Sequence, residues 1–204
     1  MAQNPAKVWD FEQTLHEKVK SKAHKDYDKL LEKKKQLKQG YVQKVESWEA
    51  SYYTTLLLRE NYHVDDEEIK QYFALDRVIE GLLQATGRLF GLKFREVKHP
   101  SVWHEEVRLF EVYSDSRLTG RFYLDLFPRE NKFNHAACFT IISGKNTPHG
   151  YQIPTASLVT NFPHPTKNTP ALLTHSDVVT LFHEFGHLMH DLLTKAPFSA
   201  QSGT

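Results

Sequence analysis

The chain has 204 residues and a mass of 23.7 kDa, and its 40% hydrophobic and 12% aromatic content is sufficient for one or two domains with a hydrophobic core. With 26 Lys and Arg against 25 Asp and Glu, the net charge gives no attraction to nucleic acid or to an anionic membrane, so we expect neither as a partner. The single cysteine, Cys138, cannot form an internal disulfide, the N-terminus lacks the apolar core of a secretory signal, and no apolar run approaches the about 20 residues of a membrane helix. We therefore expect a soluble cytoplasmic protein.

Residues 1–91 are predicted to be helical throughout, because apolar side chains recur at steps of three and four between Lys and Glu residues. Gly40 is expected to interrupt the first helix. A third helix is expected to begin near Asp65, with Glu68 completing an acidic variant of the capping box, and to end at Gly91. The apolar positions of the first two helices are Phe11, Leu15, Val19, Tyr27, Leu30, Leu31 and Leu37, and then Val45, Trp48, Tyr52 and Leu56.

A lysine-dense stretch, KLLEKKKQLKQG, occupies residues 29–40. One interpretation is a patch that binds nucleic acid or an acidic partner. The other is the solvated face of an amphipathic helix, because leucines interrupt the lysines at helical spacing.

Between about residues 93 and 161 the pattern changes to short runs rich in β-branched and aromatic residues, which predict a small sheet. Turn-like segments separate these runs, among them SGKNTPHGYQIP at residues 143–154. In RFYLDLF the alternation predicts one buried face, with Arg121, Tyr123 and Asp125 on the wetter face. The runs are KFREV, VRLFEV, RFYLDLF, HAACFTII and ASLVTN.

A last helix is predicted to begin at Ser176 or Asp177, after a proline-punctuated loop. The fold class is therefore α+β and mostly helical, with N-terminal helices, a small β-sheet in the middle and then this helix. We expect residues 1–91 to be a helical segment and residues 92–204 to hold the sheet and the last helix.

The last helix carries LFHEFGHLMH at residues 181–190. His183 and His187 lie one helical turn apart, so both imidazoles can bind one metal ion. Zinc suits this pair, since it accepts nitrogen ligands in a tetrahedron and leaves a position for water. Glu184 is placed to take a proton from that water as it attacks a peptide carbonyl. The alternative is a core helix whose histidines are simply hydrogen-bonded.

Two neighbouring residues need separate interpretations. His190 lies two turns beyond His183, about 10 Å along the helix axis, which is too far to share one tetrahedral ion, so we interpret it as a structural residue or a support for the ligands. Gly186 costs helix propensity, and close approach of another element is the expected reason for it. The metzincin pattern fails, because His190 and Leu193 occupy the positions of its glycine and third histidine.

The chain resembles the thimet oligopeptidase and oligopeptidase A family of zinc metallopeptidases. The resemblance is carried by NFPHPTKNTPALLTHSDVVTLFHEFGHLMHDLL, and upstream by YFALDRVIEGLLQATGRLFGLKFREV, VWHEEVRLFEV, GRFYLDLFPRENKFNHAACF and IPTASLVTNF. These blocks follow the family's order and cover about residues 45–204. The resemblance implies a mostly helical peptidase that cleaves short peptides in a deep channel, with His183 and His187 as zinc ligands and Glu184 as the catalytic base.

In the family the third zinc ligand is a glutamate about 25 residues past the second histidine, which would fall beyond Thr204. The resemblance therefore implies that this chain is part of a longer zinc peptidase, whose remainder is a candidate partner, and that the chain alone binds zinc weakly. Two positions depart from the family's pattern, Ala74 in place of proline and Asn131 in place of glycine. Asparagine tolerates left-handed turns, so we expect the loop at Asn131 to be kept.

The sequence thus predicts a zinc-dependent metalloendopeptidase that acts on oligopeptides. The main alternative is a non-catalytic fragment or interaction module with a basic helix and a vestigial metal site. A third interpretation, a purely structural helical fragment, predicts binding of neither zinc nor nucleic acid.

Overall fold

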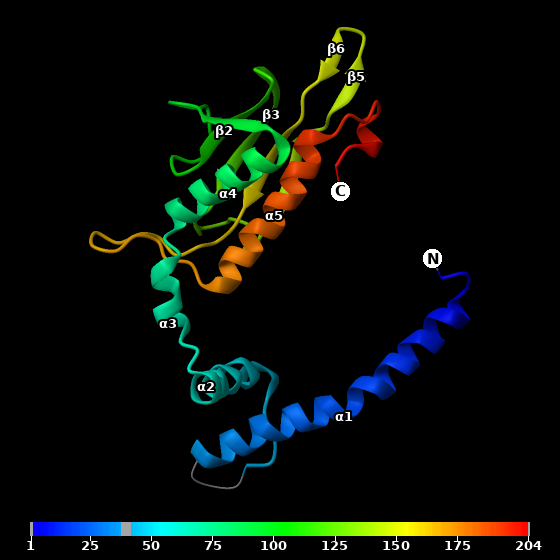
Figure 1. Ribbon diagram of the computed structural model, residues 1–204, viewed down its shortest axis with the longest axis vertical. Coiled ribbons are helices and arrows are strands. Elements are labelled where there is room, and N and C mark those ends of the chain that lie inside the picture. The colour runs from blue at the N-terminus through cyan, green and yellow to red at the C-terminus, as the bar shows by residue number, and fades with distance from the viewer. Residues whose placement is uncertain (1, 38–41, 204) are drawn as a thin grey trace. The chain divides into compact units, whose positions relative to one another are not determined.

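The computed structural model describes residues 2–37 and 42–203, and it divides into two compact units, one up to Asp65 and the other from Asp66 onward, which we describe separately (Figure 1). The break expected at Gly40 lies outside the described residues. The division into domains at residue 91 stays a prediction. None of the helices in the described ranges is long and apolar enough to span a membrane.

The first unit consists of two helices and a short 3₁₀ turn: α1 (Pro5–Leu37), η1 (Ser47–Glu49) and α2 (Ala50–Tyr62). Ion pairs hold the end of α1 to the residues that follow it. Lys33 is bonded to Glu60, and Lys34 is bonded to Glu49 and to the backbone carbonyl of residue 44. Both lysines are buried. The expectation of a fully solvated face is therefore wrong for these two lysines of the lysine-dense stretch. Their ammonium groups form ion pairs that connect α1 to α2 and to η1.

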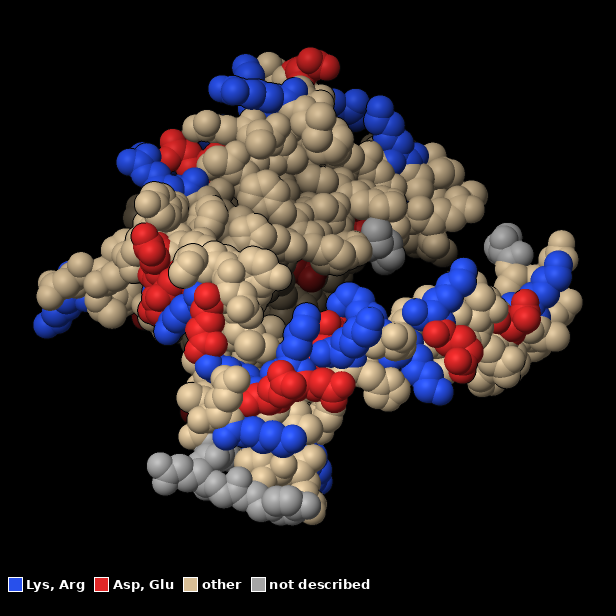
Figure 2. Space-filling view, turned by 60° about the horizontal axis from the view of Figure 1, so that its bottom comes forward, with Lys and Arg blue, Asp and Glu red and all other residues tan. Residues whose placement is uncertain are grey.

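Charges of both signs are mixed along α1, which carries nine Lys and six Asp or Glu residues. Figure 2 shows basic side chains, all lysines in this helix, interspersed with Asp and Glu side chains, and Lys22 pairs with Asp26 one turn away. A nucleic-acid or acidic-partner surface needs a concentration of positive charge that such mixing does not provide.

The second unit begins with α3 (Asp66–Ile69), η2 (Lys70–Tyr72) and α4 (Leu75–Phe90). The single helix expected here is thus interrupted at residues 73–74. The reason is pairing with the loop before the last helix: Leu75 N–H donates to the Ala171 carbonyl, and the Phe73 carbonyl accepts from Leu173 N–H. The predicted end at Gly91 is confirmed, with a left-handed φ of 67°.

The second unit continues with a mixed five-stranded sheet in the order β1-β2-β3-β7-β4. Strands β3 and β7 are parallel, and the other neighbours are antiparallel. All five runs predicted from the sequence are strands. The segment predicted as a turn at residues 143–154 instead contains a separate two-stranded ribbon, β5 and β6. The bounds are β1 (Leu92–Glu96), β2 (Arg108–Ser114), β3 (Arg117–Asp125), β4 (Ala137–Ile142), β5 (Lys145–Thr147), β6 (Gly150–Gln152) and β7 (Thr155–Val159).

One face of this sheet carries the hydrophobic core. Helix α4 and the last helix, α5 (His175–Leu193), both pack against it (Figure 1). Phe122 of β3 lies at the centre, stacked on Phe110 of β2 and edge-on to Phe185 of α5. The alternation predicted for RFYLDLF is confirmed for its apolar positions, whereas Asp125, expected on the wetter face, is buried.

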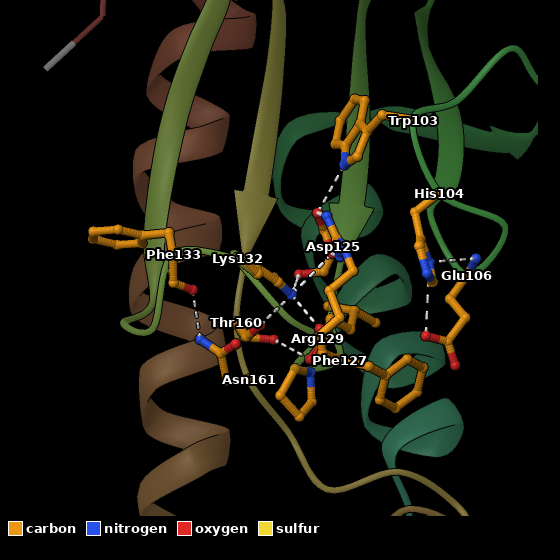
Figure 3. A network of polar contacts seen from close by, with 12 residues as sticks. Trp103, His104, Glu106, Asp125, Phe127, Arg129, Lys132, Phe133, Thr160 and Asn161 are labelled. Carbon is orange, nitrogen blue, oxygen red and sulfur yellow. Dashed lines mark hydrogen bonds and ion pairs between the residues drawn. The ribbon is translucent and has the colours of Figure 1, made fainter.

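Asp125 is buried because it is the centre of a polar network at the end of β3 (Figure 3). Arg129 donates to both of its carboxylate oxygens at 2.6 and 2.8 Å, and Trp103 Nε1 donates at 2.9 Å. Lys132 Nζ lies 2.9 Å from Oδ1 and also donates to the backbone carbonyl of Thr160 at the end of β7. Burial alone would raise the pKa of Asp125, but these hydrogen bonds outweigh it and hold the pKa well below its usual range.

The network fixes the loop between β3 and β4. Within this loop Asn131 adopts a left-handed φ of 61°, in line with the tolerance of asparagine for left-handed turns. Asn161 holds the loop further, since its side chain donates to the carbonyl of Phe133 (Figure 3) and to that of His135. The chain therefore enters β4 from a firmly held position.

Candidate active site

Helix α5 begins close to where the sequence predicts. Thr174 caps its N-terminus: the Thr174 hydroxyl accepts from Asp177 N–H, and the Asp177 carboxylate accepts from Thr174 N–H. One side of the helix is buried against the sheet, through Leu181, Phe185, Leu188, Met189 and Leu192. The opposite side, which carries His183 and His190, is exposed.

The imidazole rings of His183 and His187 converge. Their Nε2 atoms are 3.2 Å apart, and the ring centroids are 4.8 Å apart with the planes at 84°. Neither ring is sealed in the core, since His183 is exposed and His187 is half-buried. The two nitrogens thus face a common point that solvent can reach.

This geometry fits a zinc ion. Two ligands on a zinc tetrahedron, each about 2.0–2.1 Å from the ion, lie about 3.3–3.4 Å from each other. The separation of 3.2 Å between the Nε2 atoms is close to that edge length. Neutral imidazole nitrogen is also a ligand that zinc accepts readily. The donor set and its spacing therefore suit the metal that the motif predicts.

Glu184 lies beside His183 in sequence and is half-buried. Glu184 precedes Asp191 by seven residues, so it lies on the same side of α5 as Asp191, whose carboxylate accepts a hydrogen bond from Thr140 of β4. Burial, together with the negative charges of Asp191 and Glu184, raises the pKa of the Cys138 thiol to about 12. The thiol therefore stays protonated near neutral pH and is not poised to act as a nucleophile.

The described residues contain no cluster of three or more His, Cys, Asp and Glu side chains suited to a metal ion. His183 and His187 are thus brought together without a third protein ligand from residues 2–37 and 42–203. His190 forms no hydrogen bond to either of them within these ranges. It lines an apolar groove of about 630 Å³ between α4 and α5.

The surroundings of Gly186 differ from the expected close approach of another element. A Cβ atom on Gly186 would meet no atom within 4 Å, and this glycine lines the same groove as His190. The close approach proposed to explain Gly186 is therefore not provided by any described residue.

Comparison with known proteins decides the family. The model of peptidase family M3 matches residues 1–204. The chain belongs to peptidase family M3. It is 38% identical over its whole length to a protein named thimet-like oligopeptidase from Dictyostelium discoideum, of which it covers 32%. It is 36% identical over its whole length to oligopeptidase A of Escherichia coli, of which it covers 30%.

Other relatives of this M3 chain carry related names. Saccharolysin of Saccharomyces cerevisiae is 37% identical over 95% of the chain, which covers 29% of that protein. Mitochondrial intermediate peptidase of Homo sapiens is 32% identical over the whole chain, which covers 29% of it. The chain thus spans about a third of the length of these curated relatives. The resemblance found from the sequence motifs is confirmed at the level of the family.

One feature of the site was missed in the sequence. Asp191, in α5, is buried against β4 and accepts a hydrogen bond from Thr140. A signal was present, because an acidic residue seven positions after Glu184 lies on the same side of the helix, next to apolar positions. Its partner on β4 could not be identified without the register of the strand against the helix.

Proposed function

We propose that this chain is part of a zinc-dependent metalloendopeptidase that hydrolyses peptide bonds in short oligopeptides. The observation that carries the proposal is the convergence of the His183 and His187 Nε2 atoms, 3.2 Å apart, on the helix that also bears Glu184. Membership of peptidase family M3 and relatives named oligopeptidases support the reaction and the substrate class.

In this proposal His183 and His187 hold the metal through their Nε2 atoms. Zinc, when bound, lowers the pKa of a coordinated water and polarises the carbonyl under attack. Glu184 accepts the proton of the attacking water and then donates it to the leaving amine. The convergence of the two rings limits the freedom of the ligands, so little ordering is needed when the metal binds.

The free edge of β4 is where a peptide would lie. Strand β4 is at the end of the sheet, and no other strand of the described residues pairs with its outer edge. Edge strands have unpaired N–H and C=O groups, to which an extended peptide can add as a further strand. Because Glu184 lies on the side of α5 from which Asp191 bonds to β4, a peptide bound in this way would run close to the proposed base.

The chain spans about a third of its relatives, so we propose that the rest of a longer polypeptide supplies the remaining zinc ligand and the other walls of the site. A helical zincin fold for that polypeptide and a cytoplasmic location belong to the same proposal. The alternative of an interaction module with a basic helix gains no support from α1, where acidic residues are mixed with the lysines (Figure 2).

Hydrolysis of an oligopeptide by the full-length polypeptide tests the proposal. A chelator should abolish cleavage, and added zinc should restore it. Glu184→Gln should lower kcat at least about 1,000-fold with zinc content and folding unchanged, because it removes the base and leaves the ligands. Glu12→Gln, an exposed site on α1, is the matched control. Cleavage that survives Glu184→Gln would refute the role given to this residue.

A further inference from the structure

The buried carboxylate of Asp191 is not used by the proposed chemistry. Asp191 lies seven residues after Glu184, two turns further along the same side of α5. Asp191 is only 4% exposed to solvent. A buried carboxylate is costly to maintain, so the contacts that it makes are informative.

Asp191 joins three segments of the second unit. Thr140 Oγ1 of β4 donates to Asp191 Oδ2 at 2.6 Å, and Cys138 Sγ of the same strand is 4.0 Å from that oxygen. Gly203 packs against the other oxygen, since a Cβ on Gly203 would overlap Asp191 Oδ1. Among the described residues, Oδ1 itself accepts no hydrogen bond.

These contacts determine where α5 sits along β4. The helix packs on β3 and β7 through apolar side chains such as Leu188 and Leu192, and apolar packing has no directional preference along the strand. The hydrogen bonds between α5 and β4 in the described residues both end on Asp191. Thr140 also marks the point at which the pairing of β4 with β7 changes register. The Thr140–Asp191 bond therefore fixes both the helix and an irregular part of the edge strand.

We infer that Asp191 is a positioning residue: through Thr140 it sets the distance between Glu184 on α5 and a peptide bound along the edge of β4. This inference rests on the proposed function. A displacement of about 1 Å between a catalytic group and its substrate is sufficient to lower the rate of the chemical step strongly. Peptide binding to β4 is retained in such a shift, so the effect falls on kcat and not on KM.

The test uses three variants of the full-length polypeptide. Thr140→Val removes the hydroxyl and keeps the shape and β-propensity of the side chain, whereas Thr140→Ser keeps the hydroxyl. Asp191→Ala removes both oxygens that could accept the Thr140 hydroxyl. We expect Thr140→Val and Asp191→Ala to lower kcat, per folded and zinc-loaded molecule, about tenfold or more, with KM within about threefold. Thr140→Ser should keep kcat within about twofold.

Gly87→Ala controls for loss of stability alone. A Cβ at this position in α4 would lie 2.9 Å from the Leu92 carbonyl oxygen, so the variant is destabilised away from β4 and α5. Its kcat per folded, zinc-loaded molecule should equal that of the parent. A double-mutant cycle on unfolding tests the contact without any assay of activity: the Thr140→Val, Asp191→Ala double variant should unfold no more readily than the less stable of the two single variants.

The results separate the two proposals. If Glu184→Gln keeps full activity, the proposed function fails, whereas an inactive Glu184→Gln beside a fully active Thr140→Val overturns only the role of Asp191. Equal losses in Thr140→Val and Thr140→Ser would also overturn it, because the hydroxyl would then not be the group that matters. Additive effects of the two substitutions on unfolding would show that the bond does not couple α5 to β4.

Discussion

The Nε2 atoms of His183 and His187 lie 3.2 Å apart on one side of α5. Two imidazoles supply two of the four ligands of a tetrahedral zinc site. The described residues contain no group of three or more His, Cys, Asp and Glu side chains that could hold a metal ion. We therefore expect the isolated 204-residue chain to bind zinc only weakly, with a dissociation constant on the order of micromolar or weaker, because water must fill the other positions. Equilibrium dialysis against buffered zinc measures this. One tightly held zinc per isolated chain would show that a further ligand lies within it.

Gly186 and Gly87, which both lie in helices, should respond in opposite ways to alanine. A Cβ on Gly186 meets open space, so Gly186→Ala should raise the free energy of unfolding of the chain by about 0.5–1 kcal/mol through helix propensity. A Cβ on Gly87 would press on the Leu92 carbonyl at 2.9 Å, so Gly87→Ala should lower it. Urea unfolding of both variants checks the pair. Destabilisation by Gly186→Ala in the isolated chain would show that some part of it does approach α5 there.

The Asp125 network should make a large contribution to stability. Asp125→Asn leaves Arg129 and Lys132 without their carboxylate, so we expect a loss of about 3 kcal/mol in the free energy of unfolding. Asp115→Asn is the control, because Asp115 is exposed in a turn at a positive φ that asparagine also tolerates. Chemical denaturation of the two variants compares them. Equal stability of both would mean that the network is dispensable.

The same network predicts a dependence of stability on pH. The folded protein holds the pKa of Asp125 below its ordinary value of 3.8, so the unfolded chain takes up this proton first as the pH falls. The contribution of Asp125 is complete above about pH 5 and is lost as the pH falls through 3.8 towards the folded pKa. The stability difference between parent and Asp125→Asn should therefore shrink between about pH 5 and pH 3. A difference that is constant over this range would contradict the account.

Lys34 should stabilise the first unit, although it lies in a stretch that looks like a solvated charge run. Lys34→Met keeps most of the apolar stem but removes the bonds to Glu49 and to the carbonyl of residue 44. We expect the free energy of opening of α1 near Lys34 to fall by about 2 kcal/mol, measured by hydrogen exchange. Lys35→Met, at an exposed neighbouring site, should change it by less than about 0.5 kcal/mol. Similar effects of the two variants would refute the structural role of Lys34.

Local patterns in the sequence are sufficient for much of this structure. The structure has several features close to where neighbouring residues predict them. These are the five β-rich runs, the left-handed residues Gly91 and Asn131, and the start of α5. The convergence of His183 and His187 likewise follows from their spacing on a helix.

Features that depend on distant residues could not be predicted. The interruption at Phe73 and Ala74 comes from pairing with Leu172 and Leu173, about a hundred positions away. Asp125 was placed on the wetter face because Trp103 and Arg129 could not be known to converge on it. For the same reason the sequence does not predict that Thr140 on β4 is the partner of Asp191. It also does not predict that Lys33 and Lys34 are buried within a charged stretch.

The zinc content of the full-length polypeptide and of three histidine variants tests the central claim most directly. After dialysis against metal-free buffer, elemental analysis should find about one zinc per parent molecule. His183→Ala and His187→Ala should lose most of it, because each removes one of the two converging nitrogens. His190→Ala, an exposed histidine on the same helix, should retain it. Full zinc content in either His183→Ala or His187→Ala would contradict the account.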